Sequence, residues 1–189
     1  MTARSVDFRP RARIDHAALR HNLTRVRSAA PGRRIWAVVK ANAYGHGLQD
    51  VARSLADADA FGVAMLEEAI ALREAGFDRR IVLLEGAFDA GELMLISGYR
   101  VDVVVHHCSQ LEMLEQAQLA RPLDVWLKLD TGMHRLGFPP AAVTDVMQRL
   151  KHVGQVGSIF FMSHFACADE QDHPSARDQL QRFHEATDD

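Results

Sequence analysis

Two kinds of hydrophobic pattern alternate along the chain. Six short apolar runs, rich in β-branched residues, predict strands, and the apolar positions between them recur every three or four residues, as in helices. The first run contains no polar position, which is typical of a strand buried on both faces of a parallel sheet. The strands are expected at residues 35–39, 61–64, 81–84, 101–105, 123–129 and 156–162.

Helix signals lie before and between these strands. Asp15 is placed to cap a first helix whose apolar positions are Leu19, Leu23 and Val26. Ser109 begins a capping box that is expected to open another helix. The other helices are expected at 48–58, at 67–75, after Asp89, over 143–150, and at 175–186 with Leu180 and Phe183 on one side.

Strands that alternate with helices through short connections predict a parallel sheet with helices outside it. A doubly wound sheet normally carries a GxGxxG fingerprint after its first strand, whereas this chain has only GHG at residues 45–47. We therefore predict an α/β fold of the (β/α)8 TIM-barrel type. A complete barrel needs about 250 residues, so the 189 residues are expected to form one incomplete N-terminal domain of about six β/α units.

Composition and charge limit the classes of binding partner that the sequence predicts. The chain is 48% hydrophobic and 25% charged with a net charge of −3, which gives no reason to expect nucleic acid or an anionic membrane. Neither a membrane-spanning run nor a secretory signal is recognisable, and the two cysteines are compatible with a reducing cytoplasm. His106, His107 and Cys108 have no second ligand cluster at matching spacing, so no metal is predicted.

Barrel enzymes place their chemistry at the carboxyl ends of the strands. Lys40 ends the first strand, where desolvation would favour the neutral amine that attacks carbonyl groups. A solvated lysine before a glycine turn is the plainer alternative. Lys128 lies within a strand and must be neutral, modified or paired, for example with Asp130. Tyr44 and His164 follow strands and could equally be structural.

Three stretches resemble signatures of bacterial alanine racemases, which are fold-type III enzymes that use pyridoxal 5′-phosphate (PLP). They are VVKANAYGHG at 38–47, LKLDTGMHRLG at 127–137 and SHFACADE at 163–170. The likeness extends from about residue 12 to the end of the chain. It implies a PLP-binding barrel domain with a separate C-terminal β-domain that residues 1–189 do not include.

The resemblance also implies roles for individual residues. Lys40 would form the internal aldimine with PLP and act as a catalytic base, and Tyr44 would bind the cofactor phosphate. Arg135 would face the phenolic oxygen and help to bind the substrate carboxylate. His164 would pack beside the pyridine ring, and Lys128 would be carbamylated and orient Arg135.

The implied reaction is the interconversion of L- and D-alanine for peptidoglycan synthesis, in a cytoplasmic homodimer. Family members take their second base, a tyrosine, from the C-terminal domain across the dimer, and Tyr99 precedes a strand and so lies at the wrong end of the barrel. We therefore expect the 189-residue chain to racemise alanine poorly. The alternatives are a serine or broad-specificity amino-acid racemase and a non-catalytic PLP-binding domain.

Overall fold

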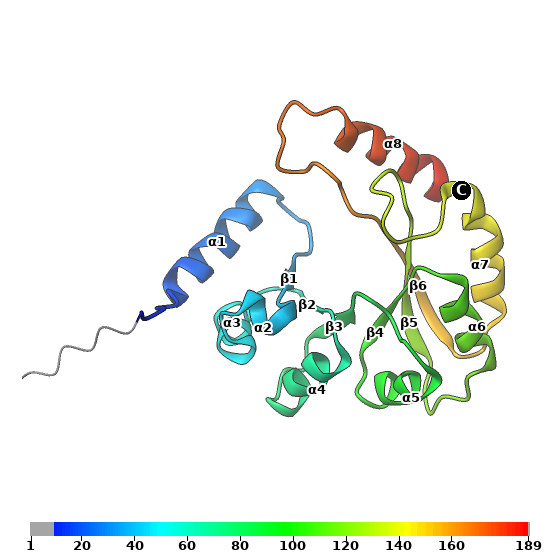
Figure 1. Ribbon diagram of the computed structural model, residues 1–189, viewed down its shortest axis with the longest axis horizontal. Helices are drawn as coiled ribbons and strands as arrows, with labels where there is room; N and C mark the ends of the chain where they lie inside the picture. The colour runs from blue at the N-terminus through cyan, green and yellow to red at the C-terminus, as the bar shows by residue number, and fades with distance from the viewer. Residues whose placement is uncertain (1–9, 189) are drawn as a thin grey trace, which may run out of the picture.

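Six parallel strands form one curved sheet in the computed structural model, which describes residues 10–188 (Figure 1). Each strand pairs only with the strands before and after it in the sequence. The prediction of an incomplete barrel built from a parallel sheet is confirmed. The strands are β1 Trp36–Val38, β2 Ala60–Val63, β3 Arg80–Leu83, β4 Asp102–Val105, β5 Leu123–Lys128 and β6 Val156–Met162.

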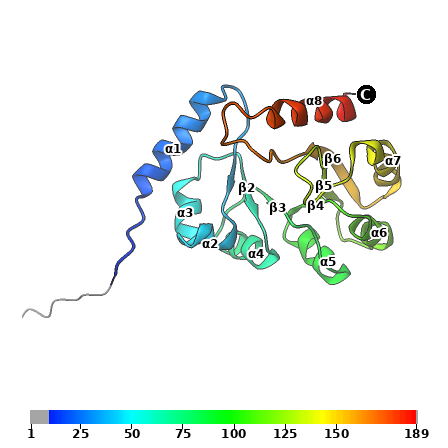
Figure 2. The ribbon, with the colours of Figure 1, turned by 45° about the horizontal axis from the view of Figure 1, so that its top comes forward.

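Helices cover the outer side of this sheet. Helices α4 to α7 follow one another along it (Figure 1), and α8 lies above the end of the sheet that carries β5 and β6 (Figure 2). The helices are α1 His16–Ala29, α2 Lys40–Tyr44, α3 Leu48–Ser54, α4 Leu66–Glu74, α5 Ala90–Gly98, α6 Cys108–Gln116, η1 Pro140–Ala142, α7 Val143–His152 and α8 Ser175–Thr187.

The two faces of the sheet bury different side chains. Val125 and Leu127 of β5 belong to the apolar core between the sheet and the helices and are fully buried. Trp126 lies between them on the inner face, because successive side chains of a strand point to opposite sides. Its ring centroid is 4.3 Å from that of Trp36 and 4.5 Å from that of Phe160. Aromatic rings therefore fill the inner side of the open barrel.

The sheet has two open edges, β1 and β6. Val38 of β1 is 40% exposed, and residues 157 and 158 of β6 are exposed as well. The prediction that the first strand is buried on both faces is therefore wrong for this chain. The reason is topological, since no strand of the described residues lies between β1 and β6 to close the barrel.

Most helix boundaries follow the prediction, and two differ, the end of α3 and the start of α6. The Asp15 carboxylate accepts the N–H groups of the first turn of α1, as expected, although Val26 of that helix is 49% exposed. Helix α3 ends at Ser54 rather than at residue 58. Helix α6 begins at Cys108 because the His107 ring, not the side chain of Ser109, caps its first turn.

Candidate active site

The carboxyl ends of the strands border a cavity of about 220 Å³. All five side chains that the sequence singles out line it, namely Lys40, Tyr44, Lys128, Arg135 and His164. They come from the ends of β1, β5 and β6, which lie at one edge because the strands are parallel. The remaining lining residues are Trp36, Val38, Leu84, Glu85, Leu136 and Met162.

Lys40 is followed by a left-handed turn of the backbone, which forms α2. Residues 41–44 have φ values of 53° or 54°, although none of them is glycine. This region costs an L-residue roughly 1–2 kcal/mol. Gly45, with φ of 82°, continues the left-handed path at no such cost. The turn brings Lys40 and Tyr44 to the wall of one cavity.

Backbone hydrogen bonds fix the turn to its surroundings. The Val39 N–H donates to the Gly62 carbonyl at 2.8 Å, which extends the β1–β2 pairing to the start of the turn. The Ala43 N–H donates back to the Val39 carbonyl at 2.8 Å. The Asn42 side-chain oxygen accepts the N–H of Leu48, the first residue of α3, at 2.8 Å. The strained segment is thus held between β2 and α3.

Lys128 is a buried lysine without a counter-charge. It is 7% exposed, and among residues 10–188 its amine forms no ion pair within 4.0 Å and no hydrogen bond. Burial lowers the pKa of Lys128 and repulsion from Arg135 lowers it further, while Asp130 and Glu85 act in the opposite direction. The ion pair with Asp130 that the sequence left open is therefore not formed, and the neutral amine is favoured.

Asp130 instead shapes the loop that carries Arg135. Its Oδ1 accepts the N–H groups of Gly132, Met133 and His134 at 2.9 to 3.0 Å. Burial raises the pKa of Asp130, but these hydrogen bonds outweigh it and hold that pKa below its usual value. The ionised carboxylate is therefore used within its own loop.

Gly137 allows the same loop to return against β5. Its φ is 128°, and a Cβ atom there would lie 2.6 Å from the Asp130 nitrogen. The neighbouring Phe138 exchanges backbone hydrogen bonds with this strand end, donating to Lys128 and accepting from Asp130 at 2.9 and 2.8 Å. The loop therefore leaves and rejoins the sheet beside Lys128, which keeps Arg135 at the cavity.

His164 lies two residues after the end of β6 and lines the cavity. It comes from the edge of the sheet opposite to β1. Partial burial lowers its pKa, and the positive charges of Lys128, Arg135 and Lys40 lower it further. The lowered pKa favours the neutral imidazole. A neutral ring can pack against an aromatic ligand without adding charge to a cavity that Lys40 and Arg135 also line.

Gln179 of α8 is a site-supporting residue that the sequence analysis missed. It is 1% exposed, although polar. Its side-chain oxygen accepts the Ala166 N–H at 2.9 Å, and its amide group donates to the His164 carbonyl at 2.8 Å and to the Thr131 hydroxyl at 3.4 Å. Gln179 thus ties the loop after β5 to the loop after β6.

Thr131 and Ser163 complete this buried connection. Their hydroxyl oxygens lie 2.7 Å apart, and the Ser163 hydroxyl donates to the Leu129 carbonyl at 2.9 Å. Thr131 lies in the stretch 127–137 and Ser163 in the stretch 163–170, so the resemblance to racemase signatures could have indicated both as site residues. For Gln179 the only signal was its position one helical turn before Phe183, which packs against the core.

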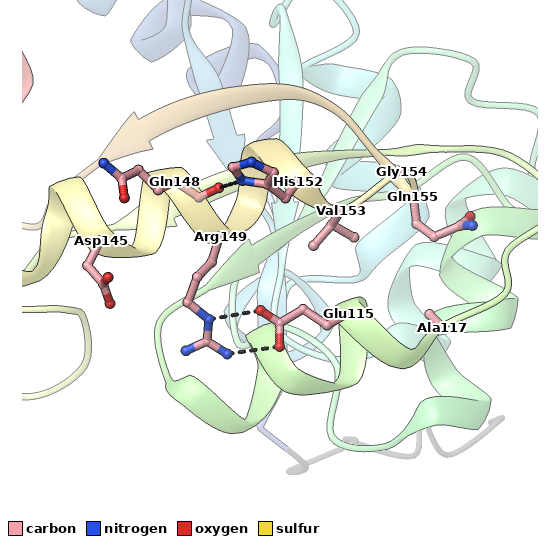
Figure 3. A pocket seen from close by; sticks show the side chains of 9 residues that line it. All are labelled: Glu115, Ala117, Asp145, Gln148, Arg149, His152, Val153, Gly154 and Gln155. Atoms are coloured by element: carbon pink, nitrogen blue, oxygen red, sulfur yellow. Dashed lines mark hydrogen bonds and ion pairs between the residues drawn. The ribbon is translucent and has the colours of Figure 1, made fainter.

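Larger grooves lie elsewhere, and they lack this chemistry. A groove of about 510 Å³ between α6 and α7 is spanned by two hydrogen bonds from Arg149 to Glu115, at 2.8 and 2.9 Å (Figure 3). Residues 153–155, which lead into the start of β6, form another part of its wall. The groove therefore belongs to the amino-terminal end of the strands, away from Lys40.

Tyr99 also lies at the amino-terminal end. It follows the last residue of α5 and lines a groove with Arg80 and Asp102, the first residues of β3 and β4. The prediction that Tyr99 is at the wrong end of the barrel for catalysis is confirmed.

His106 and His107 make structural contacts within the fold. The His106 Nε2 atom is 2.8 Å from the Glu85 carbonyl oxygen, and the His107 ring caps α6. Between residues 10 and 188, His, Cys, Asp and Glu side chains nowhere gather in a group of three that could hold a metal ion. The helices of this part of the chain are each too short or too polar to span a bilayer.

Sequence comparison covers most of the chain. Residues 14–189 match the family model for the alanine racemase N-terminal domain. The alanine racemase of Shewanella woodyi is 52% identical over 179 residues, which make up 94% of this chain and 50% of the relative. The alanine racemase of Shewanella baltica is 51% identical, and the match again covers 94% of this chain and 50% of the relative. The chain spans about half the length of the curated relatives it matches.

Solved structures agree with the sequence match. The biosynthetic alanine racemase of Pseudomonas aeruginosa superposes with a TM-score of 0.87 and 48% identity, covering 91% of this chain and 48% of that chain. The alanine racemase of Acinetobacter baumannii superposes with a TM-score of 0.83 and 41% identity, and the match covers 93% of this chain and 49% of that chain. Fold, sequence and the residues around the cavity lead to one assignment: this chain belongs to the alanine racemase N-terminal domain family.

Proposed function

We propose that this chain is the PLP-binding part of an alanine racemase, which interconverts L- and D-alanine and provides D-alanine for peptidoglycan synthesis. One observation supports this above all. Lys40, Tyr44, Lys128, Arg135 and His164 come from three strand ends and line a single cavity. We further propose that the complete protein acts as a cytoplasmic homodimer, as the family resemblance implies.

The side chains around the cavity suit PLP. Lys40 offers the primary amine that its aldehyde requires. Tyr44 and Arg135 offer hydrogen-bond donors for its anionic oxygens, and the neutral His164 ring offers an uncharged surface for its pyridine. When bound, PLP supplies an electron-withdrawing ring that stabilises negative charge at the substrate α-carbon.

The protein groups have separate tasks in this proposal. Arg135 holds the substrate carboxylate, because a guanidinium matches a carboxylate with two parallel hydrogen bonds. The Lys40 amine takes and returns the α-carbon proton on one face. Inversion requires a second base on the other face. Tyr99 cannot supply it from the far end of the strands, so we assign that role to a tyrosine outside residues 1–189.

Labelling with PLP tests the assignment of Lys40. The sequence contains three lysines, Lys40, Lys128 and Lys151, so the chain provides its own controls. After incubation with PLP, borohydride reduction and peptide mass mapping should find the cofactor on Lys40. Lys151, on the outer helix α7, reports nonspecific labelling. Label on Lys128 or Lys151 with Lys40 unmodified would contradict the proposed function.

We also propose that Lys128 is carbamylated. The neutral amine adds to the carbon of CO₂ and releases one proton, which leaves a negatively charged carbamate on Nζ. Burial and Arg135 already favour the neutral amine that this addition needs, and the carbamate would replace repulsion from the Arg135 guanidinium by attraction.

Isotopically labelled bicarbonate tests this modification. The wild-type chain should show a carbamate resonance that Lys128→Met lacks, and bicarbonate should raise the melting temperature of the wild type but not that of Lys128→Met. Lys151→Met is the matched control and should retain the resonance. A free ammonium at Lys128 in the presence of bicarbonate would overturn the proposal.

A further inference from the structure

Glu68, the third residue of α4, joins that helix to the left-handed turn after Lys40. Its Oε2 accepts the N–H groups of Ala64 and Met65 at 3.1 and 3.3 Å, which is the reach-back contact of a capping box. Its Oε1 accepts the N–H of Asn42 at 2.9 Å. One carboxylate therefore holds both the start of α4 and the second residue of the turn.

The turn needs such an external contact. Four consecutive residues other than glycine in the left-handed region are unfavourable by themselves, so the surrounding structure must select that conformation. The strand that leads into it, β1, is only three residues long and lies at an open edge. A hydrogen bond from a backbone N–H to an ionised carboxylate is roughly twice as strong as one between neutral groups.

We propose that Glu68 is a positioning residue, whose contact with Asn42 keeps the turn left-handed and thereby directs Lys40 and Tyr44 into the cavity. The consequence for PLP rests on the proposed function. The consequence for the turn does not, because the Asn42 contact involves only groups of this chain.

The chain offers a matched control at Glu92. It is the third residue of α5, and its carboxylate reaches back to the N–H of Phe88 at 2.7 Å in the same way. Its own N–H donates to the Asp89 side chain that caps the helix. Glu92 does not border the cavity. Glu68, which does not border it either, differs from Glu92 by the contact with Asn42 and by a second cap contact, with the Met65 N–H.

Two measurements on Glu68→Ala and Glu92→Ala test the proposal. Amide hydrogen exchange followed by NMR reports the protection of the Asn42 N–H, and PLP labelling reports the extent of modification at Lys40. We expect Glu68→Ala to reduce both by about tenfold, the size of a lost charge-assisted hydrogen bond. Glu92→Ala should leave both within about twofold of the wild type, although each variant loses a helix cap.

A second variant guards against loss of folding. Glu68→Asp keeps a negative charge at the start of α4 but is one methylene too short for both contacts. It should melt near the wild type and still lose protection at Asn42. Equal effects of Glu68→Ala and Glu92→Ala on Asn42 exchange would overturn the proposal. A wild type that leaves Lys40 unlabelled would refute the proposed function alone, and Asn42 exchange would still decide the role of Glu68.

Discussion

The two sides of the cavity are held in different ways. On the β1 side, Lys40 and Tyr44 sit on a left-handed turn at an open, partly exposed edge of the sheet. On the β5–β6 side, Arg135 and His164 sit on loops that are tied together below the surface by Gln179. The first side relies on single hydrogen bonds between its backbone and groups such as Gly62 and Glu68, and the second on a buried polar network.

This difference separates two ways of placing a functional group. A strained turn keeps its geometry only while each local contact persists, so single changes should act on the geometry more than on global stability. A buried network contributes to the cooperative fold, so breaking it should lower the free energy of unfolding of the whole domain.

The largest effect is expected from breaking the buried network. Gln179→Ala would leave the Ala166 N–H, the His164 carbonyl and the Thr131 hydroxyl without this partner. Each of the three lost hydrogen bonds contributes about 0.5–1.5 kcal/mol, so the free energy of unfolding in urea should fall by about 3 kcal/mol.

A control for this change lies on the same helix. Gln181 is exposed and bonds only to Glu185, one turn along, at 2.8 Å. Gln181→Ala should therefore cost less than about 0.5 kcal/mol. If Gln179→Ala and Gln181→Ala lower the free energy of unfolding equally, the buried network does not stabilise the β5–β6 side.

A smaller effect, of opposite sign, is expected on the β1 side. Ala41 is exposed and has φ of 53° and ψ of 50°. Ala41→Gly removes the Cβ penalty at this position and should raise the free energy of unfolding by up to about 1 kcal/mol. Ala18→Gly, in the right-handed helix α1, should lower it by a similar amount. If Ala41→Gly also destabilises the protein, the turn is not left-handed in solution.

The smallest effect concerns pH and the β6 end. The folded pKa of His164 lies below its ordinary value near 6.5, chiefly because of partial burial. The unfolded chain therefore binds more protons in this range, so the contribution of His164 to stability is full above about pH 6.5 and is lost as the pH falls through the lowered folded pKa. Urea unfolding at several pH values should show a shallower dependence for His164→Asn than for the wild type. Identical slopes would contradict the shift.

The sequence was sufficient for the fold and for the location of the cavity. Apolar runs mark the strands because strands of a parallel sheet are buried on both faces. Lys40 directly follows such a run and His164 follows another after one serine, and the ends of parallel strands meet at one edge. The same rule failed for β1 itself, because burial on both faces depends on a neighbouring strand that residues 10–188 do not provide.

The conformation at the site could not be predicted in the same way. Alanine strongly favours the right-handed helix, so nothing in residues 41–44 indicates φ values above 50°. That conformation is selected by groups distant in the sequence, such as Gly62 and Glu68. Gln179 was missed for a related reason, since glutamine is usually exposed, and Gln179 is buried because the loops after β5 and β6 lie against it.

The pairing order of the strands also bears on how the domain is made. Among residues 10–188 each strand pairs only with its sequence neighbours, so none of these pairings has to wait for a distant part of the chain. During synthesis, β1 can pair with β2 while β6 is still inside the ribosome, and every later β/α unit adds to an edge that already exists. The growing edge is nevertheless unpaired at every stage, so pausing between units would expose a strand to the chains of neighbouring ribosomes.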